Sequence, residues 1–278
     1  MKRLILFLGL FLAMPLAACT PEDSGSLGSA PTGVPITPGP SATPPASALP
    51  SDPTKTITVQ VWFSRGGKVF PTKRTAPYTL ETSHLALTQM MIGPSAAEAA
   101  VGVDNALPVG LSFDIKGISN GVATVSFPSR FYADGAALVR LRQAQVVYTL
   151  TQYASVSRVD FQNGAAPLGR ADLADLVPAI AVLGPVIGQS VTSPFTVTGT
   201  ANTREATVNA RLLDAAGREI ATKFTTATCG NGCRGTYSMS LSYQGCVEQN
   251  GTLEVYQISG EDGSRRDVVA IPLVLAAC

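Results

Sequence analysis

The chain has 278 residues, which is enough for two ordinary domains with apolar cores. Apolar residues make up 45% of the sequence and charged residues 14%, a composition that is typical of a folded protein and excludes a largely disordered one. Lysine and arginine total 20 against 19 acidic residues, so the sequence has no basic field for a phosphate backbone and excludes nucleic acid as the expected partner.

The first 18 residues have the parts of a secretory signal peptide, because a basic pair near the start precedes an apolar run over residues 4–12 and then small residues. The apolar run is too short to span a membrane. Residues 16–19 read Leu-Ala-Ala-Cys, which resembles the lipobox of bacterial lipoproteins. We therefore expect residues 1–18 to be a lipoprotein signal peptide and Cys19 to become the lipidated first residue. An ordinary secretory signal is the alternative.

Residues 19–54 are rich in proline, serine, glycine and threonine, with nine prolines between residues 20 and 54 and no apolar periodicity. A segment of this composition cannot bury enough apolar surface to offset the entropy lost on ordering. We expect a disordered tether that lifts the following domains off the bilayer. The protein would then be extracytoplasmic, anchored to the cell membrane or the outer membrane by lipidated Cys19.

Residues 55–165 predict a two-layer α/β domain. Alternating apolar residues predict a strand over 57–63, and apolar residues at helical spacing predict a helix over 80–92. Further on, Asn120-Gly121 separates two alternating runs, which is the strongest short-range signal for a β-hairpin. A second, longer helix follows within residues 137–162.

This longer helix is apolar over most of its circumference, so we expect it to be covered on more than one side and to dock on a sheet that contains the next strand, which ends at Phe161. The resulting order β-α-β-β-α-β favours two helices on one face of a mixed sheet. A narrow polar strip on the helix is predicted to be exposed and is a candidate binding surface, with a simply solvated face as the alternative. The strip consists of Arg142, Gln145, Thr149 and Gln152.

Residues 178–278 predict an all-β domain, joined to the first by a short connection that implies contact between the two domains. Short strands follow one another at near-regular intervals with no helical periodicity, which is typical of an antiparallel β-sandwich of immunoglobulin-like type. The fold class is therefore α+β, with an N-terminal β-α-β-β-α-β domain followed by a β-sandwich. The seven expected strands are 179–183, 194–201, 206–213, 219–227, 235–243, 252–259 and 267–275.

Several motifs in a fixed order resemble two bacterial domains. The sequences LALTQMMIGP, GVATVSF and AQVVYTLTQYASVSRVDFQNG, within residues 56–164, resemble the GerMN domain of sporulation and germination lipoproteins. The sequences GPVIGQSVTSPFTVTGTANTREATVNARLLDAAGREI and LEVYQISGEDGSRRDVVAIPLVL, within residues 180–275, resemble the immunoglobulin-like Gmad2 domain, which is often found beside GerMN. The resemblance implies a role in the spore or cell envelope. GerMN domains are similar in shape to ring-building motifs, which implies self-association as one mode of assembly.

Four cysteines remain once Cys19 is set aside, and an even number in an oxidising compartment predicts disulfides. A structural zinc site is the alternative. Cys229 and Cys233 are close enough in sequence for one half of such a site. The other two cysteines, Cys246 and Cys278, lack the paired spacing that zinc sites use, so disulfides are favoured.

The pairing follows from strand direction in the predicted sandwich. Strand 235–243 and the last strand run the same way, which places Cys246 near Cys278. Cys229 and Cys233 precede strand 235–243 and lie at its opposite end. That strand spans roughly 25 Å at about 3.3 Å per residue, far beyond the Cα separation of about 7 Å that a disulfide tolerates. We therefore predict the pairs Cys229–Cys233 and Cys246–Cys278.

The sequence contains one histidine, His84, and no G-x-S-x-G or comparable nucleophile context. We interpret His84 as a surface or capping residue and predict no catalytic residue, metal or cofactor. The leading hypothesis is a non-enzymatic, lipid-anchored envelope protein with a scaffold or assembly role, which binds another envelope protein or the peptidoglycan of the cell wall. The alternative is a cell-wall hydrolase or carbohydrate-active enzyme.

Overall fold

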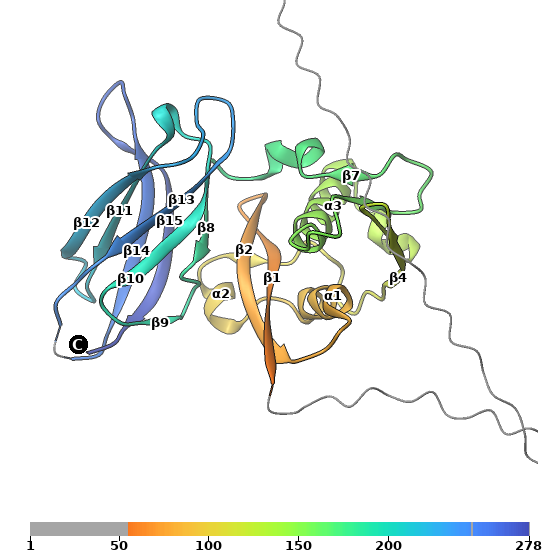
Figure 1. Cartoon of the computed structure of the whole chain (residues 1–278), viewed down its shortest axis with the longest axis horizontal. Coiled ribbons are helices and arrows are strands. Elements are labelled where there is room, and N and C mark those ends of the chain that lie inside the picture. The colour runs from red at the N-terminus through yellow and green to blue at the C-terminus, as the bar shows by residue number, and fades with distance from the viewer. Residues whose placement is uncertain (1–54, 246, 278) are drawn as a thin grey trace, which may run out of the picture. The chain divides into compact units, whose positions relative to one another are not determined.

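The computed structural model describes residues 55–245 and 247–277, which form an α+β half followed by an all-β half (Figure 1). The predicted fold class is therefore confirmed. Among the described residues, no helix combines the length and the apolarity that a membrane span requires. Outside the described residues lie the predicted signal peptide 1–18, the predicted tether 19–54, Cys19, Cys246 and Cys278.

The first half of the described chain consists of short strands, three α-helices and two 3₁₀ helices. The strands are β1 (Thr56–Arg65), β2 (Lys68–Pro77), β3 (Val103–Asp104), β4 (Asp114–Ser119), β5 (Val122–Ser126), β6 (Arg158–Asp160) and β7 (Leu168–Gly169). The α-helices are α1 (Thr82–Ile92), α2 (Ala96–Ala100) and α3 (Ala136–Leu150), and the 3₁₀ helices are η1 (Ser129–Tyr132) and η2 (Ala171–Leu176).

These strands form two sheets, so the expectation of one mixed sheet is wrong. The first sheet is antiparallel with the order β2-β1-β3, and the second has the order β4-β5-β6-β7 with β5 and β6 parallel. Helix α3 contacts β1 and β2 of the first sheet and β6 of the second. It therefore does pack against its successor strand β6, and it also packs against a second sheet that the sequence pattern did not separate from the first.

The extra sheet arises because β1 and β2 form a hairpin. Its two-residue loop is Gly66-Gly67, with φ of +58° and +74°, the left-handed conformation that a tight hairpin turn of this kind requires at both central positions. The sequence pattern did not predict strand β2, because this strand contains Pro71 and Pro77. Proline removes a ladder hydrogen bond, so it is tolerated in an edge strand, and β2 is the edge of its sheet.

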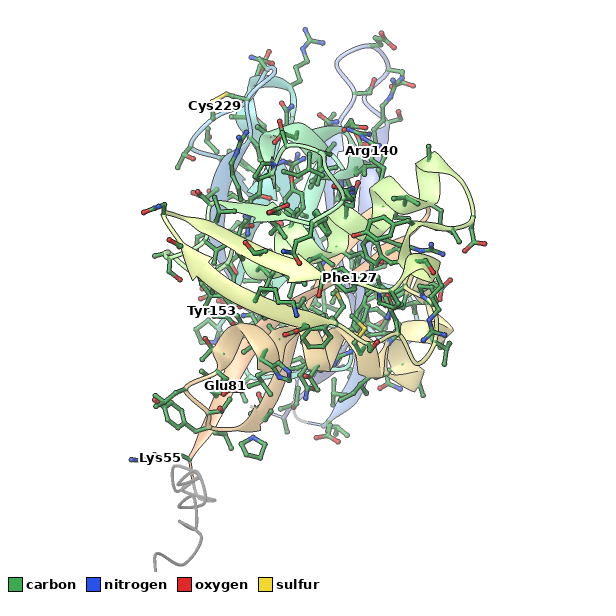
Figure 2. The ribbon with its side chains drawn as sticks, turned by 90° about the vertical axis from the view of Figure 1, so that its right-hand side faces the viewer. Lys55, Glu81, Phe127, Arg140, Tyr153 and Cys229 are labelled. Atoms are coloured by element: carbon green, nitrogen blue, oxygen red, sulfur yellow. A yellow bond between two sulfur atoms is a disulfide. The ribbon has the colours of Figure 1, made fainter. Side chains whose placement is uncertain are left out.

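Large apolar side chains from all the main elements of the first half meet in its core. Phe63 of β1, Leu87 and Met90 of α1 and Leu150 of α3 are fully buried. The segment after α3 closes this core. Tyr153 lies beside the start of α1 (Figure 2), where its hydroxyl donates a hydrogen bond to the Thr82 carbonyl oxygen at 2.8 Å.

The second half is a β-sandwich of two sheets, with the orders β13-β10-β8 and β12-β11-β14-β15-β9. All its neighbouring strands are antiparallel except β9 and β15. Seven of these strands lie where the sequence predicts them, and the two-residue β9 is additional. The strands are β8 (Ile180–Gly184), β9 (Ser190–Val191), β10 (Phe195–Ala201), β11 (Thr207–Leu213), β12 (Glu219–Thr226), β13 (Gly235–Leu241), β14 (Gln249–Ile258) and β15 (Arg265–Leu275).

Side-chain alternation along β11 separates the core of the sandwich from its outer face. Val208, Ala210 and Leu212 are fully buried between the sheets. The residues between them, Asn209 and Arg211, therefore point to the outer face of the five-stranded sheet, because successive side chains of a strand point to opposite sides.

Candidate functional site

The polar strip, carried by α3 and by Gln152 in the turn after it, lies inside the protein, so its prediction as an exposed binding surface is wrong. Arg142 is 3% exposed, Gln145 and Thr149 are fully buried, and Gln152 is half-buried. A polar strip at helical spacing predicts polar surroundings, but water is only one way to supply them. In this protein the partners are backbone groups of a neighbouring strand and of loops.

Three residues of the strip form hydrogen bonds with the edge of β1 that faces away from β2. Thr149 Oγ1 accepts a hydrogen bond from the Trp62 N–H at 3.0 Å, and Gln145 Nε2 donates to the Trp62 carbonyl oxygen at 3.1 Å. Gln152 pairs in the same way with both backbone groups of Gln60. Strand β3 covers this edge only at Ser64 and Arg65, so two side chains of α3 and Gln152 of the turn after it take the place that a longer strand would occupy. An edge closed in this way cannot accept a strand from a partner.

The fourth residue of the strip, Arg142, holds two loops. Its guanidinium donates hydrogen bonds to the carbonyl oxygens of Ala106, Phe131 and Ala133 at 2.8 to 2.9 Å, and it forms an ion pair with Asp134 at 2.7 Å. With its donors used internally, Arg142 organises the segments before and after η1 and offers little to an outside partner.

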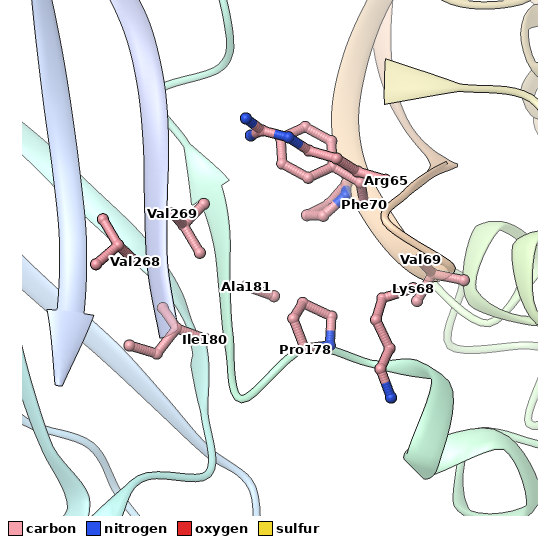
Figure 3. Close-up of a pocket in the computed structure, with 10 residues that line it drawn as sticks. Arg65, Lys68, Val69, Phe70, Pro178, Ile180, Ala181, Val268 and Val269 are labelled. Carbon is pink, nitrogen blue, oxygen red and sulfur yellow. The ribbon is translucent and has the colours of Figure 1, made fainter. Parts of the chain in front are cut away.

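A surface cleft lies where the β1–β2 hairpin faces strands β8 and β15 (Figure 3). The described residues all lie in one compact unit, Leu49–Cys278, and within it β2 contacts β8. The cleft holds about 230 Å³. Its walls are mainly apolar, and the lining residues are Arg65, Lys68, Val69, Phe70, Pro71, Pro178, Ile180, Ala181, Val268 and Val269.

Two cations of this cleft are held in place by neighbouring groups. The Arg65 guanidinium lies 5.5 Å from the centre of the Phe70 ring, and its Nη1 donates to the Ala270 carbonyl oxygen at 3.2 Å. The Lys68 ammonium donates to the carbonyl oxygen of Asp175. Each cation retains further donors, because guanidinium has five N–H groups and ammonium three. The cleft therefore combines an apolar floor with fixed positive charge.

The lining of the cleft contains no histidine, cysteine, serine, threonine, aspartate or glutamate. Its apolar walls and two cations suit an apolar group with an anionic neighbour.

His84 lies in a second hollow, of about 490 Å³, between the start of α1 and the edge strand β4. His84 is exposed, its ring packs 4.9 Å from the Phe113 ring, and its Nδ1 is 3.4 Å from Thr88 Oγ1. Among the hydrogen bonds of the described residues, none joins His84 to a carboxylate, which a catalytic triad would need. Nor do the described residues contain a group of three histidine, cysteine or acidic side chains placed to hold a metal ion.

The predicted disulfide Cys229–Cys233 is present in the loop that joins β12 to β13, where Figure 2 labels Cys229. Its loop contacts the turn after β10. The N–H of Asn231 donates to the Thr203 carbonyl oxygen at 3.1 Å, and Asn231 Oδ1 accepts from the Glu205 N–H at 3.0 Å. The pairing of Cys246 with Cys278 and the lipid anchor at Cys19 stay predictions, because these residues lie outside the described part.

Two family models match the sequence. Residues 51–168 match a family described as sporulation and spore germination, and residues 179–264 match an immunoglobulin-like domain of bacterial spore germination. No curated protein sequence matches the chain.

Among solved structures, the chain is similar to the tandem GerMN domains of the sporulation protein GerM from Bacillus subtilis, with 15% identity, a TM-score of 0.37, and 80% of this chain and 61% of that chain covered. It thus spans about three fifths of that tandem structure. It is also similar to the first GerMN domain of the same protein, with 19% identity, a TM-score of 0.33, and 40% of this chain and 86% of that chain covered.

Proposed function

We propose that this chain, which belongs to the sporulation and germination families and joins a GerMN domain to a Gmad2 domain, is a non-enzymatic, lipid-anchored protein of the cell envelope. Cys19 carries the anchor, residues 19–54 are the tether, and the two domains lie outside the cytoplasm at the cell membrane or the outer membrane. Their task is to bind another envelope protein, in a scaffold or assembly role.

The cleft of Figure 3 is the observation that carries the choice of a protein partner. Its volume of about 230 Å³ is below the roughly 300 to 1,000 Å³ that is usual for small-molecule sites. A space of this size suits one or two apolar side chains of a partner, the kind of anchor that dominates protein interfaces. The remaining donors of Arg65 and Lys68 favour an acidic residue beside that anchor.

Substitution of one exposed wall residue tests this proposal with little risk to the fold. Val268 is 45% exposed in the cleft, so Val268→Glu would fill the cleft and repel an acidic partner without disturbing the core. Ile92→Glu is the matched control, because Ile92 is 71% exposed on α1 and does not line the cleft. Full-length chains with a photo-reactive residue at position 266, which is 52% exposed two residues before Val268 and does not line the cleft, would be cross-linked in intact cells and the adducts identified by mass spectrometry.

We expect one envelope protein to be cross-linked by the parent chain and the Ile92→Glu variant, and lost in Val268→Glu. Equal cross-linking in all three chains would contradict the cleft as the binding site. The enzymatic alternative is tested separately by incubating the purified chain with peptidoglycan. Release of soluble fragments would show a hydrolase, and co-sedimentation without release would show binding to the cell wall.

A further inference from the structure

The outer face of the five-stranded sheet carries a polar groove of about 390 Å³ that the proposed function does not use. One wall is the turn between β10 and β11, and the other is the end of β14 with the turn after it. The residues that matter here are Arg204, Glu205, Asn209, Ile258 and Gly260. The volume falls within the range of about 300 to 1,000 Å³ that is usual for small-molecule sites.

Asn209 brings an unused hydrogen-bond donor to this groove. Its Nδ2 atom is shielded from solvent and has no hydrogen-bond partner among the described residues. A buried donor without a partner is unfavourable, because the bond that it makes with water in the unfolded chain is lost and not replaced. Since Asn209 lines the groove, an acceptor that enters the groove can supply the missing bond.

Two opposite charges lie beside this donor. Arg204 Nε is 3.9 Å from Glu205 Oε1, and both side chains are largely exposed, at 64% and 74%. The guanidinium rests on Gly260, where any Cβ atom would lie only 2.0 Å from Arg204 Nη1. The glycine therefore allows Arg204 to lie flat against the groove wall. Because the two charges cancel, the groove offers both donors and acceptors and favours a neutral ligand over a strongly charged one.

Each of the two strands next to β11 carries an exposed apolar side chain. Phe224 of β12 is directly opposite Asn209 in the β11–β12 ladder and is 69% exposed. Ile258, at the end of β14, lines the groove and is 44% exposed. Exposed apolar side chains such as Phe224 and Ile258 can pack against the apolar faces of a ligand while polar neighbours form hydrogen bonds with it.

We propose that this groove binds a neutral glycan built from N-acetylhexosamine units. An acetamido group supplies a carbonyl acceptor for Asn209 Nδ2 and a methyl group for Ile258. Ring hydroxyls act as donors and acceptors for Glu205 and Arg204, and the apolar face of a sugar ring lies on Phe224. The inference does not depend on the cleft of Figure 3, which is lined by other residues.

The test uses the full chain purified in detergent and the tetrasaccharide of β-1,4-linked N-acetylglucosamine, with binding measured by titration calorimetry. We expect saturable binding that weakens about tenfold in Asn209→Leu and in Phe224→Ala, since each removes one contact. Ile92→Ala, at an exposed residue outside the groove, should bind like the parent chain. Gly260→Ala should also weaken binding, because the added methyl group displaces the Arg204 guanidinium.

The Asn209→Leu variant separates ligand binding from folding. Because Asn209 Nδ2 has no partner among the residues that the structure describes, its removal should leave the unfolding midpoint unchanged or slightly raised. Cellotetraose has the same linkage without acetamido groups and should bind at least several-fold more weakly. Absence of binding by the parent chain, equal binding by the Asn209→Leu and parent chains, or equal affinity for both sugars would each overturn the inference.

Discussion

The side-chain amide of Gln152 pairs with both backbone groups of Gln60. Its Oε1 accepts a hydrogen bond from the Gln60 N–H at 2.8 Å, and its Nε2 donates to the Gln60 carbonyl oxygen at 2.7 Å. An amide side chain thus reproduces the two bonds that a neighbouring strand would form. Together with Gln145 and Thr149, this contact seals the open edge of β1 and leaves helix α3 fixed in register on the sheet.

Loss of this amide should destabilise the protein. In Gln152→Ala, both backbone groups of Gln60 lose their partners, and we expect the free energy of unfolding to fall by about 1 to 3 kcal/mol in a urea titration. Gln152→Glu should have an intermediate effect, because it keeps an acceptor for the N–H and loses the donor. The control is Gln244→Ala, at an exposed glutamine in the loop after β13, which should change stability by less than about 0.5 kcal/mol. Equal effects at both positions would contradict the edge-closing role.

The burial of the strip explains why the sequence predicted the helix and misplaced its polar face. The spacing of Arg142, Gln145, Thr149 and Gln152 indicates a helix with one polar side. A helix whose polar side faces solvent and a helix whose polar side faces the edge of a strand have the same spacing. The distinction depends on Gln60 and Trp62, more than 80 residues earlier in the chain. No local pattern contains that pairing.

The sequence predicted the disulfide but not the groove, because the disulfide depends on residues close in sequence and the groove on residues far apart. The pairing of Cys229 with Cys233 follows from their short separation in sequence and the strands around them, and the structure contains it. The groove joins Arg204 to Gly260 and Asn209 to Phe224 through sheet packing. Alternation along β11 could have placed Asn209 on the outer face, but the residues that meet it there come from other strands.

Acid should weaken the contact between α2 and β2 through Glu98. This carboxylate is 2% exposed, and it accepts hydrogen bonds from Arg74 Nη1 at 2.9 Å and from the Ser95 N–H at 2.7 Å, as well as from Thr72. Burial alone raises the pKa of Glu98, but the hydrogen bonds of Arg74, Thr72 and Ser95 outweigh it, so the pKa lies below its usual value of 4.5.

A carboxyl whose pKa is lower in the folded than in the unfolded chain adds stability above the unfolded value and loses it as the pH falls through the folded value. We therefore expect the parent chain to lose stability as the pH drops below about 4.5. Glu98→Gln should lower the unfolding free energy by about 2 kcal/mol at pH 7. Its unfolding free energy should also depend less on pH below about 4.5. If the unfolding free energy of Glu98→Gln fell as steeply at acid pH as that of the parent chain, the loss of stability would belong to other carboxyl groups.

The disulfide loop should hold the turn that forms one wall of the groove. Within that turn Glu205 and Ala206 have φ of +55° and +57°, a conformation that is costly for residues with a side chain. Asn231, inside the disulfide loop, bonds the turn on both sides of Arg204. We expect the double variant Cys229→Ser and Cys233→Ser to lose about 2 kcal/mol of stability and to bind the N-acetylglucosamine tetrasaccharide more weakly than the parent chain.

Stability should be measured with and without a reducing agent in both chains. Any remaining effect of the reducing agent in the double variant would report the predicted pair Cys246–Cys278, which non-reducing peptide mapping can identify directly. A peptide that joins Cys233 to Cys246 would contradict both pairings. Unchanged stability and unchanged sugar binding in the double variant would show that the loop does not support the turn.

The membrane anchor is testable independently of both binding sites. We expect Cys19→Ala to move the protein from the membrane fraction to the soluble fraction, because the lipid attached at Cys19 is the proposed link to the bilayer. A single acyl chain binds membranes only marginally, whereas two or three chains anchor durably, so a diacyl or triacyl modification of one cysteine is sufficient. The control is Cys229→Ser, which removes a cysteine of the described disulfide and should leave the protein at the membrane. Retention of Cys19→Ala at the membrane after a high-salt wash would refute the anchor and favour either an uncleaved signal segment or a tightly bound membrane partner.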